Sequence, residues 1–270
     1  MKRLGFETAR VRPEQRENSM NDARPLIEAT AALWKNLGEF PAMFAKSVVI
    51  NIGHKFHTAT ATLVDFGRGP LALTCFHVIA PYHEEWKSGE ALIRVGNTRV
   101  LPSQLAALDG ELDLATIRLS DEQAADLVSE DGIAAQFYQP TRWPLDPARE
   151  GEPVAVGGFP AQWRRKHSKA QEIIMPYYGI GATAVTSASE RLFGCRFERS
   201  RWVWMSRRAE LADLTMLGGL SGGPVFAERH LHRALVGIVS DYWSEMDIML
   251  MAHAHWIKED GSICTDRPWG

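Results

Sequence analysis

The chain has 270 residues, of which 45% are hydrophobic, and a formal net charge of −3. This length accommodates one or two domains with a sizeable core, and the interspersed charges give no reason to expect a nucleic-acid partner. No stretch approaches the roughly 18 apolar residues of a membrane span, and residues 1–20 lack the apolar segment of a secretory signal. The three cysteines, Cys75, Cys195 and Cys264, are too few for a disulfide framework. We therefore expect a cytoplasmic protein with no membrane partner.

Residues 1–45 are expected to form an N-terminal extension that contains one helix. Its first part is polar and charged, and its later part has apolar residues at helical spacing, at Leu26, Ala29, Leu33 and Leu37. The simplest interpretation is a helix packed on the surface of the domain that follows. The alternatives are a docking segment for a protein partner and a plug over an active site.

Residues 46–120 have the pattern of short β-strands. Runs rich in β-branched and aromatic residues, broken by glycine and proline, predict strands at 47–53, 57–67, 70–78, 89–96, 97–109 and 112–119. These strands predict a first antiparallel β-barrel. His54 and His57 have an H-x-x-H spacing, but without a third ligand nearby they do not predict a metal site.

Residues 121–150 are expected to link this barrel to a second one at 151–250. The linker begins with a helical composition and continues through several prolines. The second barrel is predicted to begin at Glu152 and to continue, after a basic loop at 161–171, through strands at 173–181, 182–189, 191–198, 201–206 and 234–243. Residues 251–270 are expected to form a short C-terminal helix and tail.

Two polar residues stand at the ends of apolar runs in the first barrel. His77 closes the run LALTCFHV, and Asp113 opens the run LDLATIRL. Asp109 and Glu111 are rival acids in the same loop. Asp113 is favoured because it directly precedes the apolar run, where its carboxylate would be buried against the histidine.

The stretch GGLSGGP in the second barrel has a serine, Ser221, surrounded by glycines. Glycines allow the tight backbone that a nucleophile on a turn requires. The N–H groups of Gly219 and Ser221 are then able to point into one pocket and stabilise an oxyanion. Taken alone, the stretch also fits a plain glycine turn between two strands. A serine needs a base to take its proton, and a carboxylate to orient that base.

The chain order His77, Asp113, Ser221 differs from the order in α/β-hydrolases and in subtilisins. LTCFHV, LDLATIRL and GLSGGP resemble the Thr-Ala-Ala-His, Asp-Ile-Ala-Leu and Gly-x-Ser-Gly-Gly-Pro elements of the chymotrypsin/trypsin-like serine peptidase family. The resemblance covers roughly residues 46–245 and is nearest to the bacterial, disulfide-free members. It implies an all-β fold of two six-stranded antiparallel β-barrels, here with an N-terminal and a short C-terminal helix. It also implies a serine endopeptidase that needs no metal or organic cofactor.

The resemblance further implies which residues meet a protein or peptide substrate. The strand ALVGIVSDYW resembles the family's Gly-Ile-Val-Ser-Trp-Gly element, which places Ser240, Asp241 and Tyr242 beside the peptide. Tyr242 stands where the family usually has glycine, so it is expected to narrow or cover the side-chain pocket. Thr215 matches the floor of that pocket and carries no charge, which gives no support for a preference for Lys or Arg.

Leu220 is a second departure from the family pattern. Members that are activated by cleavage have aspartate before the nucleophile, where it pairs with the new N-terminus. Leucine forms no ion pair, so we expect no activation by N-terminal cleavage. The protein is then competent as made, or is switched by a regulatory protein partner.

Two other functions remain open from the sequence. The same fold can serve as a protein-binding module with little activity of its own, which the bulky Leu220 and Tyr242 favour. The same triad can also serve an esterase. An intact set of His77, Asp113 and Ser221 argues against the binding module, because binding alone does not require all three groups.

Overall fold

The structure of the protein is a computed structural model. It describes residues 40–129, 135–167, 172–174, 178–197, 202–205, 217–229 and 232–264. The helix predicted in the N-terminal extension lies outside these ranges, as does Thr215. The predicted all-β architecture is confirmed, since two antiparallel sheets account for most of the described residues.

The first sheet is a half-barrel of seven strands. Their order is β5-β4-β1-β2-β3-β7-β6, and the bounds are β1 Ala45–Ile52, β2 Lys55–Asp65, β3 Pro70–Thr74, β4 Ala91–Val95, β5 Thr98–Val100, β6 Leu105–Asp109 and β7 Leu114–Arg118. In the described residues no ladder joins β5 to β6, so this sheet stays open where a closed six-stranded barrel was predicted. The predicted run at 97–109 divides into β5 and β6 because Pro102 begins a 3-10 turn, Pro102–Gln104.

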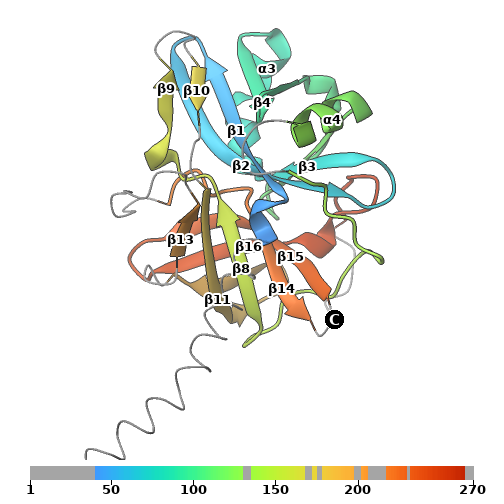
Figure 1. Ribbon diagram of the computed structural model, residues 1–270, viewed down its shortest axis with the longest axis vertical. Helices are drawn as coiled ribbons and strands as arrows, with labels where there is room; N and C mark the ends of the chain where they lie inside the picture. The colour runs from blue at the N-terminus through green and yellow to red at the C-terminus, as the bar shows by residue number, and fades with distance from the viewer. Residues whose placement is uncertain are drawn as a thin grey trace, which may run out of the picture. The chain divides into compact units, whose positions relative to one another are not determined.

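The second sheet is a closed barrel of six strands, as predicted. The strands β12 Leu192–Arg196, β16 Ile248–His253, β15 His232–Trp243, β14 Pro224–Arg229, β8 Pro153–Gly158 and β11 Tyr178–Ala188 follow in that order, and a β12–β11 pairing closes the ring. A further strand, β13 Trp202–Met205, pairs with the first four residues of β11, 178–181. Figure 1 shows this barrel below the first sheet, with β8, β11 and β13–β16 labelled.

The loop expected at 161–171 contains secondary structure of its own. A 3-10 turn, Ala161–Trp163, leads into a two-stranded ribbon made of β9 Arg165–His167 and β10 Glu172–Ile174. Two strands this short lack a hydrophobic alternation, so their pairing leaves little trace in the sequence.

In the ranges given above, helices are few and short. α2 Phe76–Ile79, the 3-10 turn Ala80–Tyr82 and α3 His83–Ser88 follow β3, and α4 Asp121–Ser129 lies in the first part of the predicted linker. The short C-terminal helix is a single 3-10 turn, Ala254–Trp256, after which Ile257 and Ile263 form a β-bridge. Within the described ranges, no helix has the length and apolar character required to cross a membrane.

One apolar core lies within the closed barrel, and the other joins the first sheet to residues of the closed barrel through an aromatic cluster. Phe44 and Tyr138 belong to the core of the first sheet and lie with their ring centroids 5.4 and 5.0 Å from that of Phe226, on β14. This contact buries apolar surface from both sheets.

Candidate active site

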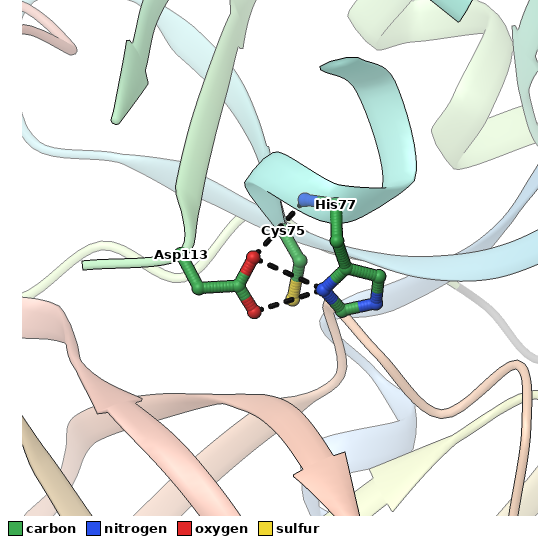
Figure 2. Close-up of side chains that lie close together, drawn as sticks. All are labelled: Cys75, His77 and Asp113. Carbon is green, nitrogen blue, oxygen red and sulfur yellow. Dashed lines mark hydrogen bonds and ion pairs between the residues drawn. The ribbon is translucent and has the colours of Figure 1, made fainter. Parts of the chain in front are cut away.

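His77 and Asp113 are brought together by the pairing of β3 with β7. His77 lies in α2, directly after β3, and Asp113 is the last residue before β7; Thr74 and Ala115 are partners in the ladder between them. The His77 ring donates from Nδ1 to the Asp113 carboxylate, with distances of 3.0 Å to Oδ1 and 2.9 Å to Oδ2 (Figure 2). The backbone N–H of His77 donates to the same Oδ1 at 3.0 Å. The carboxylate therefore fixes both the ring and the main chain of His77.

Asp113 has a third partner from the second sheet. The hydroxyl of Ser240, on β15, donates to Asp113 Oδ2 at 2.5 Å. Burial acts to raise the pKa of Asp113, but the hydrogen bonds from His77 and Ser240 outweigh it and lower that pKa. The hydrogen bond to Asp113 raises the pKa of His77 against the opposing effect of burial, and Asp241 adds to the rise. The pair is thus an ionised carboxylate beside an imidazole of increased basicity.

The structure separates Asp113 from the two rival acids. Asp109 Oδ1 accepts the backbone N–H groups of Glu111 and Leu112, both at 2.9 Å, and so stabilises the turn. The carboxylate of Glu111 forms an exposed ion pair with Arg191 at 3.0 Å. Asp113 itself has a φ of 53°, in the left-handed region that few residues other than glycine, Asn and Asp adopt. A backbone held in this conformation turns the carboxylate toward His77.

Ser221 lies on the turn that precedes β14, and its hydroxyl points to β15. Ser221 Oγ donates to the carbonyl of Ser240 at 3.1 Å. No hydrogen bond joins Ser221 to His77 Nε2 in the described part of the chain. Ser240 therefore touches both halves of the site, with its hydroxyl on Asp113 and its carbonyl on Ser221.

The Ser221 turn is held by buried threonines from the first sheet. The hydroxyl of Thr60, on β2, donates to the carbonyl of Gly219 at 2.7 Å and accepts the backbone N–H of Phe159 at 2.9 Å. The backbone N–H of Thr60 donates to the carbonyl of Ser221 at 2.8 Å. The hydroxyl of Thr62 donates to the carbonyl of Gly222 at 2.8 Å. Because these contacts cross between the sheets, β2 sets the position of the turn.

Within the part of the chain that the structure describes, the backbone around Gly219 leaves two N–H groups without an acceptor. Ala161 N donates to the carbonyl of Gly218 at 2.6 Å, which turns that carbonyl toward the 159–161 segment and the Gly219 N–H away from it. Gly219 has a φ of 93°, and a Cβ there would lie 2.5 Å from Ala161 N, so only glycine fits. Among the described residues, no acceptor bonds to the N–H of Gly219 or of Ser221.

Leu220 is buried between these two N–H groups. Its side chain is 1% exposed and belongs to the core of the closed barrel. Leu220 therefore contributes apolar packing to the turn, where members activated by cleavage have an aspartate paired with the N-terminus.

The three residues predicted beside the substrate occupy the end of β15. Its ladder with β14 ends at Ile238, whereas its ladder with β16 continues to Trp243. Ser240 is buried, and Asp241 is exposed and accepts the Tyr242 backbone N–H at 2.7 Å. The Tyr242 hydroxyl donates to Asp247 at 2.5 Å, and its ring meets Phe197 edge to face at 5.6 Å. The tyrosine side chain is therefore held in one position beside the strand.

Sequence reasoning missed two residues that touch this site. Thr60 is assigned no role from the sequence, and only its polar character at a buried position signals that it forms hydrogen bonds. From the sequence, Cys75 is only one of three cysteines that are too few for a disulfide framework. Its Sγ, His77 Nδ1 and an Asp113 oxygen all lie within 4.8 Å of one another. The spacing C-x-H was the only signal for this contact.

A family model described as a trypsin-like peptidase domain matches residues 59–238. A search of curated proteins found no match. Among solved structures, a serine endoprotease from Yersinia pestis is 13% identical, with a TM-score of 0.46 and coverage of 82% of this chain and 61% of that one. The thermostable serine protease AL20 from an extremophilic microorganism is 14% identical, with a TM-score of 0.43 and coverage of 78% and 91%. The active form of the Rv3671c protease from M. tuberculosis is 15% identical, with a TM-score of 0.42 and coverage of 81% and 80%.

Proposed function

The chain belongs to the family of trypsin-like peptidase domains and is a hydrolase of the serine protease type, and from this premise we propose that it is an endopeptidase acting through Ser221, His77 and Asp113. Ser221 Oγ attacks the carbonyl carbon of the peptide bond and forms an acyl-enzyme. His77 Nε2 takes the hydroxyl proton and returns it to the leaving amine. Asp113 holds the proton on His77 Nδ1 and so leaves Nε2 as the base.

The observation that carries this proposal is the network of hydrogen bonds around Asp113. A carboxylate that accepts the ring and the backbone of His77 together with the Ser240 hydroxyl is oriented for one task, the support of an imidazole base. A structural ion pair would not require the base to remain half exposed, and the His77 side chain is 48% exposed. That exposure leaves Nε2 accessible to a substrate.

The backbone N–H groups of Gly219 and Ser221 form the proposed oxyanion hole. Donors fixed in advance stabilise the negative oxygen of the tetrahedral intermediate without any cost of reorganisation. The Thr60 hydroxyl and Ala161 N–H hold the two carbonyls that flank Gly219. These contacts support the proposal that the oxyanion hole is formed before the substrate binds.

The substrate is proposed to bind as an added strand beside the end of β15, where the β14 ladder has ended. The Ser240 carbonyl would accept a peptide N–H there. That acceptor now holds the Ser221 hydroxyl, so binding would displace the hydroxyl toward His77. Catalytic hydrogen bonds often form only in the substrate complex. Under this proposal Tyr242 narrows the side-chain pocket and selects small side chains.

We infer that the protein needs no N-terminal cleavage for activity, because Leu220 packs in the core and has no ion pair to gain. A protein with its N-terminus intact should react at the same rate as one trimmed before residue 40. Activity that appears only after trimming would contradict this.

The test of the proposed function is labelling with a fluorophosphonate, which reacts with a serine only when a base and an oxyanion hole are assembled. The wild type should be labelled at Ser221, and Ser221→Ala should abolish the label. Ser244→Ala, at an exposed serine on the turn after β15, is the matched control and should keep it.

The second candidate function is a protein-binding module of the same fold. The hydrogen bond of Ser221 to Ser240 in place of His77 favours it. A folded wild type that takes no label, alone and with added peptides, would support this function against the first.

A further inference from the structure

Cys75 carries a sulfur atom into the centre of the proposed catalytic site. The residue lies between β3 and α2, and its side chain is fully buried. Its Sγ donates to the carbonyl of Val239, next to Ser240, at 3.0 Å. Figure 2 shows the thiol beside the His77 ring and the Asp113 carboxylate. Peptide hydrolysis by Ser221 makes no use of this thiol.

The three side chains together form a donor set for a metal ion. Sγ, His77 Nδ1 and a carboxylate oxygen of Asp113 all lie within 4.8 Å of one another. Tetrahedral zinc, with bonds of about 2.0–2.3 Å to such ligands, requires separations of about 3.3–3.6 Å between them. The Nδ1 to Oδ2 distance is already 2.9 Å, so movements of a few tenths of an ångström to about one ångström complete the set.

The chemistry of the donors selects the ion. A thiolate and an imidazole suit Zn²⁺ and Cd²⁺, whereas Mg²⁺ and Ca²⁺ require oxygen ligands in larger number. Asp113 and the nearby Asp241 add negative charge around the thiol and the imidazole. Of the three donors, the His77 side chain is half exposed to solvent.

We propose that Cys75, His77 and Asp113 form an inhibitory site for Zn²⁺ or a similar thiophilic divalent cation. The thiol proton leaves to solvent as Sγ binds the ion. The imidazole proton moves from Nδ1 to Nε2 as Nδ1 becomes a ligand. A protonated Nε2 is unable to accept the proton of Ser221, so hydrolysis stops. The inhibition rests on the function proposed above, whereas the binding of the ion does not.

The experiment measures inhibition of fluorophosphonate labelling by Zn²⁺, with each variant normalised to its own metal-free rate. Cys75→Ala removes a direct ligand and should raise the Zn²⁺ concentration that gives half-maximal inhibition. The increase should exceed the roughly 10–100-fold that is typical when a residue hydrogen-bonded to a metal ligand is lost. Cys195→Ala, at an equally buried cysteine on β12, is the matched control and should behave as the wild type. Chelation should restore labelling, and Mg²⁺ should have no effect. If Cys75→Ala does not fold, Cys75→Ser replaces it in the inhibition assay, since a hydroxyl is a poor zinc ligand.

Direct binding separates the two proposals. Cd²⁺ added to the Ser221→Ala protein should give a thiolate-to-cadmium absorption band with one ion bound per chain, and Cys75→Ala should remove the band. Inhibition that is the same in wild type and Cys75→Ala, or a band that persists without Cys75, would overturn the inference. Absence of labelling in metal-free wild type with the band present would refute the proposed function and leave the metal site standing.

Discussion

Thr60→Ala tests whether β2 holds the Ser221 turn, and with it the proposed oxyanion hole, in place. The hydroxyl of Thr60 is fully buried, and its loss removes one partner from the Gly219 carbonyl and one from the Phe159 N–H. The buried Gly219 carbonyl left without that partner costs about 1–3 kcal/mol in the free energy of unfolding. Direct loss of an oxyanion donor costs about 10²–10³-fold in kcat. Thr60 acts only through the Gly219 peptide, so we expect a smaller loss in kcat of about tenfold, or ~1.4 kcal/mol.

The assay compares the rate of fluorophosphonate labelling, and kcat and KM once a substrate is known, with unfolding in urea. Thr60→Ser keeps the hydroxyl and should restore the rate. Thr116→Ala is the control for stability, because Thr116 is equally buried on β7 and donates to the distant Gly261 carbonyl. The reasoning is refuted if Thr60→Ala lowers stability as Thr116→Ala does and leaves the rate unchanged.

Three further changes test other parts of the site and the fold. Asp113→Asn should lower kcat by about 10⁴-fold, as the equivalent change does in serine proteases. Because Asp113 raises the pKa of His77 above 6.5, the residual pH–rate profile should also shift its acid limb to lower pH, and an unshifted limb would refute the assignment. Tyr242→Gly should raise kcat/KM for substrates with large side chains before the scissile bond relative to small ones, measured with a peptide library. Burial lowers the pKa of His253 from 6.5 to about 4. Because the unfolded chain then binds a proton at a higher pH than the folded one, the free energy of unfolding should fall by about 3 kcal/mol as pH falls from 6.5 to 4. Urea unfolding measured across this pH range should show this decrease in the wild type, and His253→Gln should abolish it.

Most of the fold follows from patterns that are local in sequence. Alternating apolar runs and glycine or proline breaks predict long strands such as β2 and β15, because this pattern lies within the residues of each strand. Closure of a sheet is different. The β12–β11 ladder closes the second barrel, and in the described residues no such ladder closes the first. The periodicity of single strands does not predict whether a sheet closes.

The sequence alone also selected His77, Asp113 and Ser221, because each stands in a short motif beside an apolar run or a glycine turn. Choice of Asp113 over Asp109 and Glu111 rested on position. In the structure the Asp109 carboxylate is occupied by backbone hydrogen bonds and the Glu111 carboxylate by an ion pair. The bulky Leu220 and Tyr242 were visible from the sequence as departures from a family pattern. The environment of each, a core for Leu220 and a hydrogen bond to Asp247 for Tyr242, was not.

Only the tertiary structure decided what surrounds these residues. The contacts of Ser240 with Asp113, Thr60 with Gly219 and Cys75 with Val239 join positions 127, 159 and 164 residues apart. Each depends on the register of several strands and on the packing of two sheets against each other. A one-residue change of register turns a side chain to the opposite face of its sheet. The sequence therefore determined which groups perform the proposed chemistry, and the packing of the sheets decided which neighbours hold them, orient them and, at Cys75, add a ligand.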